Sequence, residues 1–360
     1  MNKKNKVLVA MSGGIDSSVA AALLQKRGLE VLGVYMKLFP SSFSKENDFS
    51  AQKSAEAASC LGIEHFVVDL SQKFKSQIID YFVKEYARGY TPNPCVKCNP
   101  YIKFNALLEE SRRIGAHYIA TGHYVRIVRR PKSSEYYIKR GLDKRKDQSY
   151  FLYLLSQKHI KQALMPLGER KKEQVKKQAL KFNFPTAHRH ESQEVCFIPD
   201  NDYINFIKKK SLQGFIQGPI LDSQGNTLGK HHGYARFTIG QRRGLGIAAS
   251  QPLYVLDINP RTNEVIVGPE KKLYKKSLTA SKIHWISGQT LESSLRVLAQ
   301  IRYNHKPQEA MIRPKDSGMV EVIFKEPQRA ITPGQSVVFY DGEKLLGGGT
   351  IIRNKTLDET

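Results

Sequence analysis

Strand-like and helix-like segments alternate along the first 125 residues, and this alternation limits the fold more than any other feature. Residues 7–11 form a continuous apolar run, which is typical of a strand buried on both faces, and residues 17–27 carry apolar side chains at helical spacing. Further strands are predicted at 31–38, 66–70 and 118–121, with helices at 51–61, 74–88 and 102–114. Strands separated by helices predict an α/β fold with a parallel sheet, whose ligands bind at the carboxyl ends of the strands.

The second half of the chain has a different pattern. Residues 126–150 are basic and polar, and helical spacing returns up to about residue 210. Beyond that point, short β-rich runs lie between turn signals, and Asp341-Gly342 is typical of a two-residue β-hairpin. We therefore predict three domains: a catalytic domain at 1–210, a small β-rich central domain at 211–279 and a C-terminal β-barrel at 280–360.

The positive charge of the chain is concentrated in one segment. The formal net charge is +24, of which residues 71–180 carry +15 and residues 1–70 only +1. A basic face of this kind favours a polyanionic partner such as RNA, although a lysine-rich genome would raise the total as well. Six tyrosines in this part of the chain are candidates for stacking on unpaired bases, each also readable as an ordinary half-buried side chain: Tyr86, Tyr90, Tyr101, Tyr124, Tyr150 and Tyr153.

Composition excludes several classes of protein. At 40% hydrophobic residues the chain is too apolar to be disordered, and four cysteines are too few for a disulfide scaffold of 360 residues. No apolar run approaches the roughly 20 residues of a membrane span. We expect a cytoplasmic protein with no membrane partner.

A glycine-rich turn, Ser12-Gly13-Gly14-Ile15-Asp16-Ser17-Ser18, follows the first predicted strand and opens the first helix. Backbone N–H groups converge at such a turn with the positive end of the helix dipole, which favours a phosphate group. Asp16 beside a phosphate would suit Mg²⁺. The simpler alternative is a helix N-cap formed by Ser12 or Asp16. Neither a Walker loop nor a GxGxxG fingerprint is present.

Further motifs narrow the assignment. They are TPNPCVKCN at 91–99, IKF at 102–104, ATGHY at 120–124, KDQSYFL at 146–152, EVCFI at 194–198 and TIGQRRGLG at 238–246. Together with the loop at 12–18, in this order and spacing, they resemble the tRNA-specific 2-thiouridylases of the PP-loop ATP pyrophosphatase superfamily. The resemblance spans nearly the whole chain and implies a PP-loop catalytic domain that cleaves ATP to AMP and pyrophosphate while it adenylates a carbonyl oxygen. It implies that ATP is held by Ala10, Met11, Ser12, Gly13, Gly14, Ile15, Asp16, Ser17, Met36 and Gly122.

The cysteines differ in their surroundings. Cys60 lies in an Ala-rich helical segment and is expected to be buried, whereas Cys95 and Cys98 form a CxxC in a predicted loop. Lys97 and Lys103 should make that loop electropositive and lower the thiol pKa values. One CxxC cannot complete a zinc site, although His188 and His190 near Cys196 could add ligands.

The resemblance implies a chemistry for two of these thiols. Cys196 matches the cysteine that carries sulfur as a persulfide, and Cys98 matches the nucleophile that ends in a Cys98–Cys196 disulfide. Such a disulfide requires the two segments to meet, with Cα atoms within about 7 Å. Where the commonest family pattern has an acid–base Asp, this chain has Cys95. Either Cys95 supplies the acid–base assistance, or another residue or a water molecule does. The CxxC itself leaves two further alternatives: a Cys95–Cys98 disulfide, or a [4Fe-4S] cluster on Cys95, Cys98 and Cys196 that delivers sulfide.

The resemblance also implies the RNA partner. The family acts on the wobble uridine, position 34, of the tRNAs for Lys, Glu and Gln, and takes its sulfur from a donor protein, either a cysteine desulfurase or a relay. The target base would contact Asn93, Pro94 and Cys95, with His123 beside it. The remaining contacts to tRNA would come from Lys146, Asp147, Gln148, Arg302, Tyr303 and Gln335. From the residues alone, Arg302 and Gln335 would be an exposed strand residue and a turn residue.

Two other functions fit parts of the sequence. An ammonia-using synthetase would keep the ATP loop, but residue 2 is Asn, so an N-terminal glutaminase nucleophile is absent. A non-catalytic RNA-binding protein would explain the charge, but not an intact Asp16 together with three cysteines in the motifs.

Overall fold

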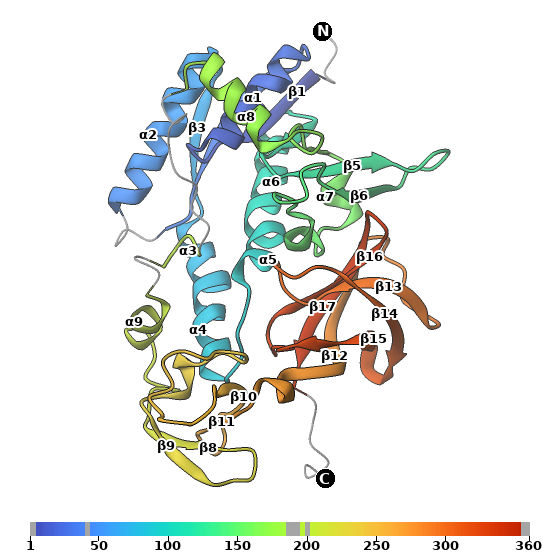
Figure 1. Cartoon of the computed structure of the whole chain (residues 1–360). Coiled ribbons are helices and arrows are strands. Elements are labelled where there is room, and N and C mark those ends of the chain that lie inside the picture. The colour runs from blue at the N-terminus through green and yellow to red at the C-terminus, as the bar shows by residue number, and fades with distance from the viewer. Residues whose placement is uncertain (1–4, 40–43, 185–194, 199–201, 354–360) are drawn as a thin grey trace.

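A five-stranded parallel sheet forms the N-terminal part of the computed structural model, which describes residues 5–39, 44–184, 195–198 and 202–353 (Figure 1). The strand order is β3-β2-β1-β4-β7. Its strands are β1 (Lys6–Ala10), β2 (Glu30–Lys37), β3 (His65–Asp69), β4 (Tyr118–Ala120) and β7 (Ala163–Leu164). The prediction of an α/β fold with a parallel sheet is confirmed.

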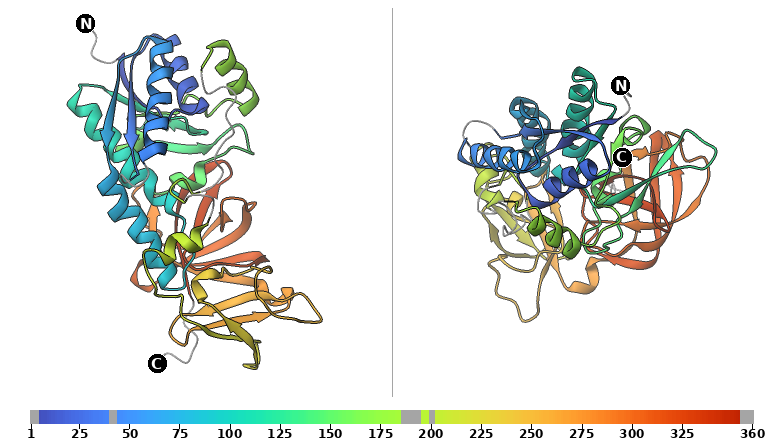
Figure 2. Two further views of the ribbon diagram at one scale, coloured as in Figure 1. Left: turned by 90° about the vertical axis from the view of Figure 1, so that its left-hand side faces the viewer. Right: turned by 90° about the horizontal axis from the view of Figure 1, so that it is seen from above.

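Helices cover both faces of this sheet (Figure 2). The helices are α1 (Ile15–Lys26), α2 (Ser44–Leu61), α6 (Asn105–Arg113) and α8 (Lys172–Lys181). Because side chains alternate along β1, Val7 and Val9 pack with α1, α2 and α8 on one face, while Leu8 packs with α6 on the other. The continuous apolar run of this strand is explained by burial on both sides.

Two long helical segments extend away from the sheet (Figure 1). The first comprises α3 (Ser71–Phe74), a π-helical turn (Lys75–Ile79) and α4 (Asp80–Ala87), close to the helix predicted at 74–88. The second comprises α5 (Pro94–Cys98), a π-helical turn (Asn99–Phe104) and α6, so it begins well before the predicted start near residue 102. The CxxC therefore lies on a helix, and the prediction of a loop there is wrong.

The remaining strands form the middle and C-terminal parts. The middle sheet has the order β10-β11-β8-β9 and contains β8 (Gly218–Leu221), β9 (Thr227–His231), β10 (Tyr254–Asn259) and β11 (Glu264–Gly268). The short α9 (Tyr203–Lys208) precedes it. The C-terminal strands are β12 (Tyr274–Trp285), β13 (Leu295–Gln300), β14 (Gln308–Lys315), β15 (Met319–Arg329), β16 (Ser336–Asp341) and β17 (Lys344–Ile352).

These C-terminal strands close into a six-stranded barrel, as predicted, because β12 pairs with both β15 and β17. Asp341 pairs with Lys344 across a two-residue turn in which Gly342 has φ +55°, so the predicted hairpin is confirmed. Glycine suits this left-handed conformation because it has no Cβ.

A β-hairpin of the α/β part joins the barrel sheet. It consists of β5 (Val125–Arg129) and β6 (Tyr136–Arg140), and β6 pairs with β17 through Ile138 and Leu345. In the sequence this segment is recognisable only as basic and polar. Its apolar positions were too few to reveal a strand whose partner lies about two hundred residues further along the chain.

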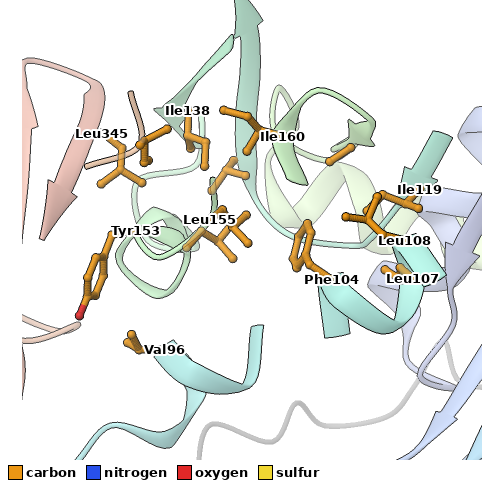
Figure 3. Close-up of a cluster of buried hydrophobic side chains, with 14 of the residues drawn as sticks. Val96, Phe104, Leu107, Leu108, Ile119, Ile138, Tyr153, Leu155, Ile160 and Leu345 are labelled. Carbon is orange, nitrogen blue, oxygen red and sulfur yellow. The ribbon is translucent and has the colours of Figure 1, made fainter. Parts of the chain in front are cut away.

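A buried cluster connects the barrel with the CxxC helix (Figure 3). Val96 and Phe104 belong to the same cluster as Leu155, near α7 (Gln157–Ile160), and as Ile138 and Leu345 of the hairpin and barrel. Full burial of one such side chain stabilises a fold by about 1.5–3 kcal/mol. The barrel is thereby held against the helix that carries Cys95 and Cys98.

Among the residues that the structure describes, no helix is both long and apolar enough to cross a bilayer.

Candidate active site

The glycine-rich turn lies at the carboxyl edge of the sheet, between β1 and α1. Gly13 has φ +73°, and a Cβ there would lie 2.7 Å from the Ser50 carbonyl oxygen, so only glycine fits. The N-cap of α1 is Gly14, and no side chain caps this end of the helix. The alternative of a simple cap by Ser12 or Asp16 is therefore wrong, and the N–H groups of the first turn keep no side-chain acceptor. Instead, Ser17 Oγ accepts from Ser12 N at 3.1 Å and donates to Gly14 O.

The other predicted ATP residues lie at the same edge. Met36 is near the end of β2, and Gly122 follows β4 directly. A Cβ on Gly122 would lie 2.9 Å from backbone atoms of Asp16 and Ser17, so the chain after β4 touches the first turn of α1. The structure thus brings together Ala10, Met11, Ser12, Gly13, Gly14, Ile15, Asp16, Ser17, Met36 and Gly122; their contact with ATP remains a prediction.

Two residues that the sequence patterns did not connect with the glycine-rich loop contact Asp16. Lys172 Nζ lies 2.7 and 2.8 Å from the two carboxylate oxygens, and the Tyr124 hydroxyl donates to Oδ1 at 2.8 Å. Lys172 begins α8 and is 156 residues away in sequence. No local pattern could have indicated this pair, because helix α8 reaches the loop through its packing on α1.

The CxxC helix is explained by its N-terminal residues. The Asn93 side chain accepts a hydrogen bond from Cys95 N at 3.2 Å, and Pro94 occupies the first helical position, where its missing N–H costs nothing. Cys95 is half-buried and Cys98 is buried. Asn99 Nδ2 donates to the carbonyl oxygens of Cys95 and Phe151, which ties this helix to the KDQSYFL motif.

Burial controls the ionisation of the thiols. Desolvation raises the pKa of Cys95 and raises the pKa of Cys98 to about 11, although the Lys103 ammonium opposes the shift in both. The expectation of lowered thiol pKa values is therefore wrong for this ligand-free state: one nearby cation does not offset the loss of solvation. Lys97 does not act on these thiols, because its ammonium is directed at the ring of Tyr81, 3.4 Å from the ring centroid.

Cys196 meets the CxxC helix. Phe197 belongs to the same buried cluster as Cys98, and its ring packs against Phe74 and Phe82. Cys196 itself is exposed, yet the surrounding protein raises its pKa to about 12, with further rises from the nearby Cys95 and Cys98 thiols. The expected meeting of the two segments is found.

The four cysteines are free thiols, so neither predicted disulfide is formed. Within the described ranges, no three His, Cys, Asp or Glu side chains form a group that could hold a metal ion, and this includes the three thiols of the site. His188 and His190 lie outside the described residues. Cys60 is exposed, not buried as predicted, because it lies at the solvent side of the last turn of α2.

Lys103 is central to the thiol group. Burial opposes its charge, but Cys98, Cys196 and Cys95 together raise the pKa of its ammonium. The same charge acts on His123, whose pKa is lowered to about 3 by desolvation and, second, by Lys103. His123 Nδ1 also lies 2.7 Å from Thr121 Oγ1. At neutral pH the site therefore holds a neutral imidazole beside a cationic lysine.

The depressed pKa of His123 makes stability depend on pH. The folded protein favours the neutral ring, so this stabilisation is complete above the unfolded pKa of about 6.5 and is lost as the pH falls toward 3. Between pH 6 and 4 we expect His123 to contribute about 1.4 kcal/mol per pH unit to the slope of the unfolding free energy. The unfolding free energy is measured by urea titration at several pH values. Its dependence on pH should be weaker by that amount in His123→Gln, whereas His117→Gln, which changes an exposed histidine, should match the wild type. The same pH dependence in all three proteins would contradict the prediction.

The predicted tRNA-binding residues lie around the CxxC helix, and most have protein partners. Asp147 accepts from Gly141 N and from Ser149, and Gln148 accepts from Tyr124 N. Lys146 is partly exposed in the same segment. The role of all three in RNA binding remains a prediction.

The barrel contributes the other three residues. Arg302 donates to the Arg329 carbonyl oxygen at 2.7 Å, Tyr303 packs on Phe151 with ring centroids 4.5 Å apart, and Gln335 donates to the Thr91 carbonyl oxygen at 2.8 Å. These loops therefore border the segments that hold Asn93, Pro94 and Cys95. Residues far apart in the sequence are brought to one region, although each contact also has a structural use.

Most of the tyrosines proposed for base stacking are unsuitable. Four of them are buried, in three different hydrophobic clusters of the fold: Tyr86, Tyr124, Tyr150 and Tyr153. Tyr90 is half-buried, and Tyr101 is 44% exposed. Only the latter two present a surface to a partner.

Comparisons with known proteins agree with this arrangement. Residues 5–200 match the family model described as tRNA methyl transferase HUP domain, 204–269 its PRC-barrel domain and 275–351 the aminomethyltransferase beta-barrel domain. The tRNA-specific 2-thiouridylase MnmA of Carboxydothermus hydrogenoformans is 46% identical over 97% of this chain and 98% of its own length. The chain belongs to the tRNA-specific 2-thiouridylase family.

Other members of the family are equally similar. The tRNA-specific 2-thiouridylase MnmA 1 of Caldanaerobacter subterraneus is 48% identical, covering 98% of this chain and 99% of that protein. The corresponding protein of Clostridioides difficile is 44% identical, covering 98% of both chains. The similarity therefore extends over the α/β part, the middle module and the barrel alike.

Proposed function

We propose that this protein is a tRNA-uridine 2-sulfurtransferase that thiolates the wobble uridine, position 34, of the tRNAs for Lys, Glu and Gln in the cytoplasm. Family membership supports sulfur transfer to tRNA and the use of ATP. The observation that carries the proposal is the common location of the parts. The phosphate-type loop lies at the carboxyl edge of the sheet. Cys98 and Phe197, the residue after Cys196, share a buried cluster against which Leu38 and Leu70 pack at the carboxyl ends of β2 and β3.

The first step activates the base. The uracil 2-oxygen attacks the α-phosphorus of ATP, pyrophosphate leaves, and C2 of the uracil becomes electrophilic because AMP is a good leaving group. The N–H groups of the loop and the first turn of α1 stabilise the phosphates. Mg²⁺ is normally held by one or two carboxylates together with the nucleotide phosphates, and Asp16 is the carboxylate at this loop that fits.

The second step transfers sulfur. The terminal sulfur of a Cys196 persulfide attacks C2 and expels AMP. The Cys98 thiolate then attacks the Cys196 sulfur, which releases 2-thiouridine and leaves a Cys98–Cys196 disulfide. A thiol reductant and a sulfur-donor protein, a cysteine desulfurase or a relay, must restore the persulfide for the next cycle.

Lys103 supports this chemistry electrostatically. Desolvation by the surrounding protein raises the pKa of each of the three thiols, and the charge of Lys103 opposes that rise in every case. Cys95 stands where an Asp would supply acid–base assistance. Because its own thiol stays protonated at neutral pH, it can donate a proton but cannot act as a base without first losing one.

A [4Fe-4S] cluster does not fit the described arrangement, because Cys95, Cys98 and Cys196 are not grouped as metal ligands. Iron and acid-labile sulfide analysis of anaerobically purified protein would reveal a cluster if the thiols rearrange to bind one.

The function is tested by incubating the protein with ATP, Mg²⁺, cysteine, a cysteine desulfurase and unmodified tRNA for Glu, followed by nucleoside mass spectrometry. We expect ATP-dependent 2-thiouridine at position 34. The control is the same tRNA with cytidine at this position, which should remain unmodified. Absence of 2-thiouridine with every sulfur source, including free hydrosulfide, would contradict the proposal.

A further inference from the structure

The glycine-rich loop contains no cation of its own. Residues 10–18 include no Lys or Arg, and their one charged side chain is the carboxylate of Asp16. A nucleotide triphosphate placed at this loop would meet N–H groups and the helix dipole, which is equivalent to only about half a positive charge, beside a full negative charge. A phosphate loop of this composition requires a cation from elsewhere in the chain.

Among the residues that the structure describes, two lysines approach the loop from other helices. Lys53 of α2 lies near Gly13, but its ammonium pairs with Glu56 at 2.7 Å. Lys172 of α8 is different, because its ammonium lies against both oxygens of the loop's own Asp16 and its side chain is only 8% exposed. Of the two, Lys172 is the one directed at the loop.

The position of Lys172 is set by several contacts. Its backbone N–H donates to Asp143 at 3.0 Å, and α8 packs along α1. Its ammonium also lies 5.8 Å from the ring centroid of Tyr124, whose hydroxyl bonds the same carboxylate. The lysine and the carboxylate are thus held together at the first turn of α1.

This ion pair is poorly suited to a purely structural role. A buried charge pair gains little net stability, because desolvation of the two groups offsets their attraction. Asp16 is 32% exposed, so one side of the pair remains open at the loop. A carboxylate engaged on both oxygens by an ammonium is also not free to bind Mg²⁺ until that ammonium moves.

We propose that Lys172 is a nucleotide-binding residue that supplies the missing cation of the phosphate loop. Its ion pair with Asp16 is the resting arrangement of the empty site. When the nucleotide binds, the ammonium bonds a phosphate oxygen, and Asp16 is released for the nucleotide-bound cation. This inference rests on the proposed use of ATP and adds a residue to that site.

The test measures ATP and adenosine affinities by isothermal titration calorimetry in EDTA, so that no metal contributes. Lys172→Met should bind ATP at least about tenfold more weakly and adenosine within about twofold of the wild type, because adenosine has no phosphate. The matched control is Lys176→Met, which removes the same charge from the exposed side of the same helix and should bind ATP normally.

A second pair of variants separates phosphate binding from support of Asp16. Asp16→Asn should bind metal-free ATP more tightly than the wild type, because Lys172 is released and a negative charge is removed. Adding Lys172→Met to Asp16→Asn should weaken ATP binding at least about tenfold, and this double variant leaves no unpaired buried charge if the single variant fails to fold.

Equal ATP affinity of Asp16→Asn and of the double variant would overturn the inference, since Lys172 would then act only through Asp16. An equal loss of adenosine and ATP binding in Lys172→Met would overturn it as well. If the wild type binds ATP and Lys172→Met binds it equally well, the inference is overturned but the proposed function stands. A wild-type protein that binds no ATP overturns both.

Discussion

Replacement of Cys98 or Cys196 by serine is expected to reduce 2-thiouridine formation at least about a thousandfold. A serine hydroxyl can neither carry a persulfide nor attack one to form a disulfide, and removal of a nucleophile that acts in a covalent step costs several orders of magnitude. The measurement is single-turnover thiolation of tRNA for Glu, quantified by nucleoside mass spectrometry. Affinity for tRNA should be unchanged, because neither substitution alters charge.

Cys60→Ser is the control for this experiment, since Cys60 is an exposed thiol on α2 outside the cluster that contains Cys98. It should retain full activity. A hydroxyl at the buried position 98 costs about 1–3 kcal/mol of stability, so Cys98→Ala is the companion variant, checked by thermal melting. Full activity in Cys98→Ala, or a loss confined to Cys60→Ser, would exclude the proposed sulfur chemistry.

Gly122→Ala is expected to disable the nucleotide site without touching a polar group. The added Cβ would lie 2.9 Å from the backbone of Asp16 and Ser17, and neither the strand end nor the first turn of α1 can yield without displacing the loop. Overpacking of this kind costs about 1–3 kcal/mol of stability. We expect ATP affinity to fall at least about thirtyfold, measured by calorimetry alongside the unfolding free energy.

The matched control is Gly229→Ala in β9, where the added methyl group would meet only Ile247 at 3.7 Å. It should bind ATP like the wild type and lose little stability. Normal ATP binding by a folded Gly122→Ala would show that the nucleotide does not depend on the contact between β4 and α1.

Local patterns were sufficient for the sheet and for the loop at its edge. The apolar run at β1 and the helical spacing after it depend on side-chain period alone, and the structure places both within a residue or two of the prediction. The hairpin at Asp341-Gly342 was equally predictable, because a two-residue turn needs only its own residues to be recognised. The sequence motifs were also specific enough to indicate the family.

The environment of the cysteines was not predictable in the same way. Lys97 and Lys103 were both expected to lower the thiol pKa values, but the structure turns Lys97 toward Tyr81 and buries the CxxC, so desolvation prevails. Cys60 was expected inside and is exposed. The thiol pKa values and the exposure of Cys60 both depend on which side of a helix faces the interior. Neighbouring residues in the sequence do not decide that.

The sequence by itself determined the alternation of strands and helices, the phosphate-type loop, the barrel and the family, because these depend on local periodicity and on motifs whose residues are adjacent. Only the tertiary structure decided that Lys172 reaches Asp16, that the β5–β6 hairpin extends the barrel, and that Lys103 lies among three thiols. Those arrangements result from packing between elements far apart in the chain. Electrostatic and hydrogen-bond partners are chosen by distance in space, which one-dimensional spacing does not contain.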